Sequence, residues 1–135
     1  MEITIEKSQN LKQKPADESK LGFGQLFTDH MFNMDYSPEK GWHNPRIEPY
    51  KPIEMDPASM VLHYGQGVFE GMKAYNTESG DIKLFRPQEN FKRLNFSNER
   101  LRIPKFDEDF LLHALKELIK VEKDWVPKAP GTSLY

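Results

Sequence analysis

Apolar residues recur with helical spacing most clearly in the last third of the chain. The apolar positions there recur every three or four residues: Phe110, Leu111, Ala114, Leu115, Leu118 and Ile119. This spacing predicts a helix with one buried face. Asp107 stands where an N-cap is expected, and Glu108 and Asp109 suit the positive end of a helix. A second helix is predicted from Arg86 to about Leu101, because Pro87 favours a first helical turn.

Shorter apolar runs predict strands. Met72–Tyr75 and Ile82–Phe85 flank the polar residues 76–81, an arrangement typical of a β-hairpin. Partial alternation from Leu21 to Asp35 predicts another strand with a buried face. Short strands are also expected at Ile3–Ile5 and Ile53–Met55.

The remaining segments predict connections. Five prolines between Pro38 and Pro57 exclude a helix and favour an extended connection, and Asp56 and Pro57 are suited to begin a short helical turn. Residues 1–20 are polar and predict a loosely held leader, so residues 21–135 form the folded domain. The predicted fold is of the α/β class (α+β type), a mostly antiparallel sheet with packed helices.

Composition narrows the function. The 135 residues and 15.8 kDa suit one domain. The formal charge is -2, with 19 basic residues scattered among 21 acidic ones, so nucleic acid is not expected as a partner. No apolar run approaches the roughly 20 residues of a membrane span, so no membrane partner is expected. The chain has no cysteine and no recognisable secretory signal, which favours a cytoplasmic location.

The stretch from Val61 to Arg93 departs from the ordinary core pattern. Gly65, Gly67 and Gly71 fall among large rings within a few residues. Glycine is used where φ is positive or where another group approaches the main chain closely, and backbone beside aromatic walls is how a small-molecule pocket is lined.

Individual side chains leave alternatives open when they are taken alone. An arginine at position 93 is most often a solvated or ion-paired surface residue, and aromatic residues are more often core than pocket. Glu70 has the character of a general base, but a turn or backbone-bonding role explains it equally well. The four histidines lack paired metal spacing, so no metal is assigned.

The chain resembles the N-terminal half of branched-chain amino acid aminotransferases, which are fold-type IV pyridoxal-phosphate enzymes. The resemblance rests on an ordered set of blocks: Phe23–Met31, Gly41–Trp42, Pro45–Ile47, Pro57–Ser59, Leu62–Gly65, Phe69–Tyr75, Leu84–Pro87, Asn90–Arg93, Lys123–Pro127 and Gly131–Tyr135. No single block is specific, but the ordered set is.

The resemblance implies roles for particular residues. Arg93 would bind the phosphate of pyridoxal 5'-phosphate, and Arg86 would be structural. Five residues would wall the apolar substrate pocket, Tyr64 in the partner subunit's active site: Phe23, Tyr64, Phe69, Gly71 and Tyr135. The Schiff-base lysine would lie beyond Tyr135, so the chain is expected to be a truncated N-terminal domain that is inactive alone and has no catalytic residue of its own.

The implied reaction of the whole enzyme is reversible amino transfer in a homodimer. The donors would be L-leucine, L-isoleucine and L-valine, the acceptor 2-oxoglutarate, and the products branched 2-oxo acids and L-glutamate. A D-amino acid aminotransferase or an aminodeoxychorismate lyase of the same fold type is the alternative enzyme. A non-catalytic binding module is the alternative from another class.

Overall fold

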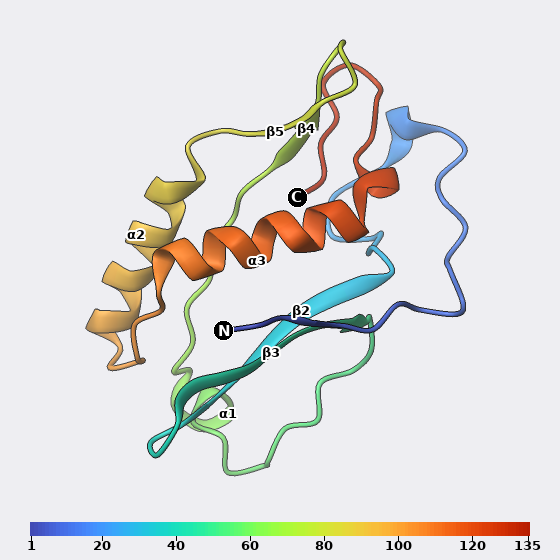
Figure 1. Cartoon of the computed structure of the whole chain (residues 1–135). Helices are drawn as coiled ribbons and strands as arrows, with labels where there is room; N and C mark the ends of the chain where they lie inside the picture. Colours follow the sequence, from blue (N-terminus) through green and yellow to red (C-terminus); the bar gives the residue numbers. More distant parts are fainter.

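The computed structural model describes all residues, Met1–Tyr135. Along the chain the elements are β1 (Thr4–Ile5), β2 (His30–Ser37), β3 (Gly41–Pro49), α1 (Met60–Tyr64), β4 (Ala74–Asn76), β5 (Ile82–Leu84), α2 (Pro87–Arg100) and α3 (Glu108–Val121), with 3-10 turns at Glu18–Lys20 and Lys123–Trp125. Helix α3 runs between the β1–β3–β2 sheet and the β4–β5 hairpin (Figure 1). The predicted mixture of helices and mainly antiparallel strands is confirmed.

The larger sheet is built around β3. This central strand pairs antiparallel with β2 and parallel with β1, in the order β1-β3-β2. Its register against β2 shifts opposite Asn33 and Asp35, where Asn44 has a φ of 52°. Because Pro45 has no N–H to donate, this bulge lets the strand continue past it. The predicted extended connection over residues 38–57 therefore contains a regular strand.

One strand prediction is wrong, another is confirmed only from His30 onward, and one helix start is shifted. The segment before His30 does not pair as a strand, because its polar groups accept hydrogen bonds from Lys12 and its rings pack on Tyr50 and Tyr135 instead. Residues 53–55 are also irregular, with Ile53 and Met55 exposed, so no buried face stabilises a strand there. Asp56 Oδ1 accepts a hydrogen bond from the Ala58 N–H (2.7 Å), which caps a turn, and α1 begins only at Met60.

The two long helices and the hairpin follow the prediction. Asp107 Oδ1 accepts the Phe110 N–H at 2.9 Å and caps α3, while Pro87 opens α2. Strands β4 and β5 pair antiparallel across the polar turn. Asn95 of α2 makes two hydrogen bonds to the backbone of Phe106, so α2 is fastened to the connection that leads into α3.

The first 20 residues are held against the domain at several points. Besides the pairing of β1 with β3, the Ser8 N–H donates to His30 Nε2 and the Lys12 N–H to Asp29 Oδ1, both at 2.8 Å. The segment is polar, as predicted, but it is fastened by backbone donors rather than loosely attached. No helix combines the length and apolar character needed to cross a membrane.

The hydrophobic core is small for the length of the chain. Only 14 of 135 residues are buried, and the apolar ones are Ile47, Ala74, Phe91, Ala114 and Val126. Many large apolar side chains consequently remain on the surface, including several from the glycine-rich stretch. Exposed apolar area on this scale is typical of a surface that another protein segment covers.

Candidate functional site

The candidate site is organised by the irregular segment that joins α1 to β4. Gly65 ends α1 in the left-handed conformation, with a φ of 62°. A glycine meets no Cβ penalty at such a helix C-cap. The segment then runs without regular structure to Ala74, and Glu70 and Gly71 lie within it against α2 and the C-terminal residues.

Arg93 and Glu70 form the charged centre of this segment. Arg93 Nε donates to Glu70 Oε1 at 2.6 Å, and Nη2 donates to Glu70 Oε2 at 2.7 Å. The arginine side chain is 67% exposed, whereas the glutamate side chain is only 8% exposed. This is a two-point, charge-assisted contact along one side of the guanidinium, and its outer edge faces solvent.

The pair changes the titration of both groups. Hydrogen bonds from Arg93, with smaller contributions from Asn90 and the Gly71 N–H, outweigh burial and lower the pKa of Glu70 to about 2. The same contact raises the pKa of Arg93. Glu70 is therefore ionised at neutral pH and does not have the proton affinity of a general base. Its bond to the backbone of Gly71, at 2.8 Å, confirms the backbone-bonding alternative.

Asn90 fastens the loop to the helix. Its Nδ2 donates to Glu70 Oε2 at 2.8 Å and to the Gly71 carbonyl oxygen at 2.9 Å. Asn90 and Arg93 are three residues apart in α2, so their side chains lie on the same face. One helix face thus binds both the carboxylate and the backbone of the segment.

Gly71 also makes room for an aromatic ring. A Cβ at this position would lie 2.2 Å from the Tyr135 hydroxyl oxygen and 2.9 Å from two of its ring carbons. The Phe23 ring meets the Tyr135 ring edge-on, with centroids 5.0 Å apart. Leu134 and Ala74 exchange backbone hydrogen bonds, which brings Tyr135 beside β4. The structure therefore brings three predicted pocket residues, Phe23, Gly71 and Tyr135, into one cluster.

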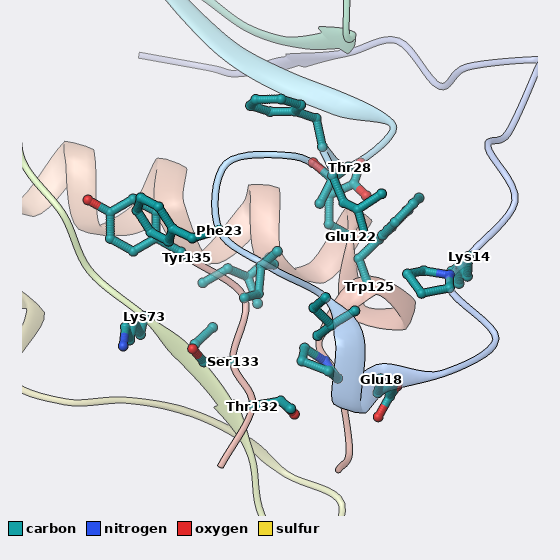
Figure 2. Close-up of a pocket in the computed structure, with 18 of the residues that line it drawn as sticks. Lys14, Glu18, Phe23, Thr28, Lys73, Glu122, Trp125, Thr132, Ser133 and Tyr135 are labelled. Atoms are coloured by element: carbon teal, nitrogen blue, oxygen red, sulfur yellow. The ribbon is translucent and has the colours of Figure 1, made fainter. Parts of the chain in front are cut away.

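Phe23 and Tyr135 border a cavity of about 570 Å³. Its walls come from the segment before β2, the β4–β5 hairpin, α3 and the C-terminal residues; Figure 2 shows Phe23 and Tyr135 at one end and Trp125 and Lys14 at the other. Small-molecule pockets span roughly 300–1,000 Å³ and are mainly apolar. The cavity has the size and much of the character of such a pocket.

Two other predicted pocket residues lie elsewhere. Tyr64 is 80% exposed at the end of α1, and Phe69 is 91% exposed in the irregular segment. Neither side chain borders the cavity. Their predicted contact with substrate, in Tyr64's case across a subunit boundary, stays a prediction.

A second polar network was not found from the sequence. His30 Nε2 accepts the Ser8 N–H, so its Nδ1 carries the ring proton and donates to Glu122 Oε1. Asp29 accepts hydrogen bonds from the Lys12 N–H and from Trp125 Nε1 (2.7 Å). The partners of these groups lie 17 to 96 positions away in sequence, so no local pattern indicates the network. It stabilises the fold and does not contact Arg93.

The pairing partners of Arg93 were also missed from the sequence. Nothing local links Glu70 to Arg93, 23 positions away, but the three-residue interval between Asn90 and Arg93 was a usable signal.

No group of three or more His, Cys, Asp or Glu side chains could hold a metal ion.

The residues fit one end of the predicted cofactor. A phosphate accepts paired N–H donors from a guanidinium, and Arg93 keeps donors on an exposed edge while Glu70 holds the other side. The aromatic cluster begins at Gly71, the residue directly after Glu70. A guanidinium suited to a phosphate and an aromatic cluster therefore meet at two consecutive residues, Glu70 and Gly71.

The sequences of several known proteins align with this chain over nearly its whole length. No family model matches the chain. The chain is 56% identical to branched-chain-amino-acid aminotransferase 2 and 59% identical to branched-chain-amino-acid transaminase 1, both of Bacillus subtilis (strain 168), over 98% of its length. It is 45% identical to a branched-chain-amino-acid aminotransferase of Mycolicibacterium smegmatis over its full length. The chain spans 36 to 38% of the length of these relatives, and the resemblance read from its motifs is confirmed.

Proposed function

We propose that this chain forms the cofactor-phosphate region and one substrate wall of a branched-chain-amino-acid aminotransferase. The whole enzyme would transfer the amino group of L-leucine, L-isoleucine or L-valine to 2-oxoglutarate, giving the branched 2-oxo acid and L-glutamate. The observation that carries the proposal is Arg93, whose guanidinium is held on one side and open on the other beside an aromatic cluster.

Pyridoxal 5'-phosphate would supply the conjugated ring that stabilises negative charge on the substrate α-carbon. Arg93 would hold its phosphate by donating N–H groups and by supplying the countercharge. Glu70 is ionised and acts in this scheme only on Arg93. The lysine that bonds to the cofactor is predicted to lie beyond Tyr135. We propose no lysine of this chain for that role.

The aromatic cluster would hold the branched side chain of the substrate. Phe23 and Tyr135 present ring surface at the cavity, and Gly71 leaves the space that the Tyr135 ring occupies. Rings provide apolar area and exclude water without many rotatable bonds. One methylene in an apolar pocket is worth only about 1–3 kcal/mol, so the enzyme would accept all three branched amino acids.

The enzyme would act as a homodimer in which Tyr64 reaches the neighbouring active site. The 80% exposure of Tyr64 and the small core support this proposal, because both leave apolar surface for a second subunit. The cytoplasmic location stays a prediction.

The test is glutamate formation by the protein encoded by the complete gene. It would be supplied with pyridoxal 5'-phosphate, 2-oxoglutarate and either L-leucine or a D-amino acid. We expect turnover with L-leucine only, and no turnover by residues 1–135 alone. Activity with the D-amino acid only would contradict the proposed substrate but keep the cofactor, whereas no activity with either would contradict the aminotransferase itself.

A further inference from the structure

Glu70 is built into the structure more firmly than an ordinary surface ion-pair partner. Its Oε2 accepts three hydrogen bonds, from Arg93 Nη2 (2.7 Å), Asn90 Nδ2 (2.8 Å) and its neighbour's Gly71 N–H (2.8 Å), while Oε1 accepts Arg93 Nε (2.6 Å). Rotation of the carboxylate would break several of these bonds together. Two of these bonds, from Asn90 of α2 and from the Gly71 N–H, do not involve Arg93, so Oε2 is also held independently of the arginine.

Arg93 has no comparable support of its own. Its side chain is 67% exposed, and the hydrogen bonds that its guanidinium makes both go to Glu70. A long exposed side chain of this kind samples many rotamers unless a partner selects one. Glu70 supplies that partner, and the planar two-point contact fixes the plane of the guanidinium as well as its location.

The remaining donors of Arg93 lie on the outer edge. A guanidinium has five N–H groups in a fixed fork, of which Glu70 engages one on Nε and one on Nη2. The other three, two on Nη1 and one on Nη2, form an edge that fits two oxygens of a phosphate. The carboxylate thus occupies a side of the fork that leaves this edge free.

We infer that Glu70, held in place by Asn90, is a positioning residue that orients the guanidinium of Arg93 toward the cofactor phosphate. The inference rests on the proposed phosphate-binding role of Arg93. Preorganising the donors in this way lowers the ordering cost of binding and so tightens the phosphate contact. The opposing effect of the carboxylate is partial neutralisation of Arg93, which would weaken the binding of an anion.

The two effects predict opposite results for Glu70→Gln. Loss of the charge alone would strengthen phosphate binding, whereas loss of orientation would weaken it. Asn90→Ala separates them further, because it loosens Glu70 and leaves the negative charge in place. Glu99→Gln is the matched control: it removes the carboxylate that pairs with Lys105 at 3.1 Å, on the same helix but six residues from Arg93 and therefore on a different face.

The experiment measures equilibrium binding of pyridoxal 5'-phosphate and of pyridoxal, which lacks the phosphate, to the cofactor-free protein encoded by the complete gene. We expect Glu70→Gln to weaken binding of the phosphorylated cofactor about three- to tenfold, since charge-assisted hydrogen bonds are lost. Binding of pyridoxal should be unchanged. Asn90→Ala should show a smaller loss with the same specificity, and Glu99→Gln should match the parent protein.

A double-variant comparison tests whether Glu70 acts through Arg93. In the Arg93→Ala background, Glu70→Gln should cause no further loss, because the group that it positions is gone. Equal or tighter cofactor binding by Glu70→Gln would overturn the inference, and so would equal losses for cofactor and pyridoxal, which indicate a merely structural role. An Arg93→Ala variant that binds the cofactor like the parent would instead overturn the proposed function of Arg93 itself.

Discussion

The buried network around Glu122 and the network around Glu70 both consist of a glutamate carboxylate and the side-chain and backbone donors that it binds. They differ in whether any N–H donor stays free for a ligand. Glu122 is 2% exposed and accepts hydrogen bonds from His30 Nδ1 and the Asp29 N–H (3.3 Å). His30 and Asp29 in turn accept backbone donors from the N-terminal segment. These contacts join the segment before β2 to the end of α3, and every N–H donor of the network is paired within the chain.

In the network around Glu70, the acceptor groups are all engaged but some of the N–H donors are not. Its carboxylate is 8% exposed and fully engaged, but its partner Arg93 is 67% exposed and keeps unused N–H donors. A buried polar group without a partner costs free energy, so the Glu122 network must be complete. An exposed guanidinium is solvated in the free protein and can exchange that water for a phosphate. The first network therefore stabilises the fold, whereas the second is suited to binding.

The largest expected effect comes from breaking the closed network. Glu122→Ala should lower the free energy of unfolding by about 3 kcal/mol, because it leaves the His30 Nδ1–H and the Asp29 N–H buried without acceptors. Urea unfolding followed by tryptophan fluorescence measures this. Glu117→Ala, which removes an ion pair with Lys120 on the same helix, should leave the free energy of unfolding close to that of the parent. Equal stability of the two variants would contradict a structural role for Glu122.

Removing the exposed partner should affect cofactor binding more than stability. Arg93→Ala in the whole protein should weaken retention of pyridoxal 5'-phosphate about 30-fold, since charge-assisted hydrogen bonds to the phosphate are lost. The ranking of leucine, isoleucine and valine should stay the same. Cofactor content after dialysis and the apparent affinity on readdition provide the measurement. Equal cofactor occupancy in variant and parent would contradict the role of Arg93.

A third substitution tests whether the aromatic cluster contacts the substrate next to the cofactor phosphate. Gly71→Ala would place a Cβ 2.2 Å from the Tyr135 hydroxyl oxygen, so the ring must shift. We expect the KM for L-leucine to rise about tenfold, because a misplaced wall costs roughly 1–2 kcal/mol of apolar contact. Steady-state kinetics measures this, and adding Tyr135→Phe should restore part of the affinity. An unchanged KM would show that this wall does not contact the substrate.

The smallest expected effect is the pH dependence of the Glu70 contact. The folded-state pKa of about 2 lies below the ordinary value of 4.5, so the contact stabilises the folded protein fully above pH 4.5 and is lost as the pH falls toward 2. Because Arg93 is exposed, we expect Glu70→Gln to cost only about 1 kcal/mol at pH 7. Urea unfolding of parent and variant should converge between pH 4.5 and 2. A difference that persists to pH 2 would contradict the ionised contact.

Predictions from the sequence succeeded where the determining chemistry is local. Asp107 caps α3 through a residue three positions later, and Pro87 opens α2, so both helix starts could be identified. The hairpin followed from its polar turn. The predicted strand over residues 21–35 was wrong before His30, since partial alternation does not reveal that this segment borders a cavity and accepts distant hydrogen bonds.

For the candidate site, too, some features could be predicted from the sequence and others could not. Arg93, Phe23, Gly71 and Tyr135 could be proposed from the ordered motifs that they belong to. The ring contact between Phe23 and Tyr135 joins residues near opposite ends of the chain, and the pairing of Glu70 with Arg93 spans 23 positions. Neither contact has a periodic pattern or a local spacing that would indicate it.

By itself, the sequence determined the helices, the hairpin, the family resemblance and the residue types available for phosphate and apolar contacts. These depend on caps, turns and spacing within a few residues, where chain geometry leaves few alternatives. Only the tertiary structure decided that the Glu122 network is closed and that Arg93 is held on one side and open on the other. That difference depends on burial and on partners distant in sequence, because long-range packing sets which hydrogen-bonding groups are engaged within the chain and which still face solvent.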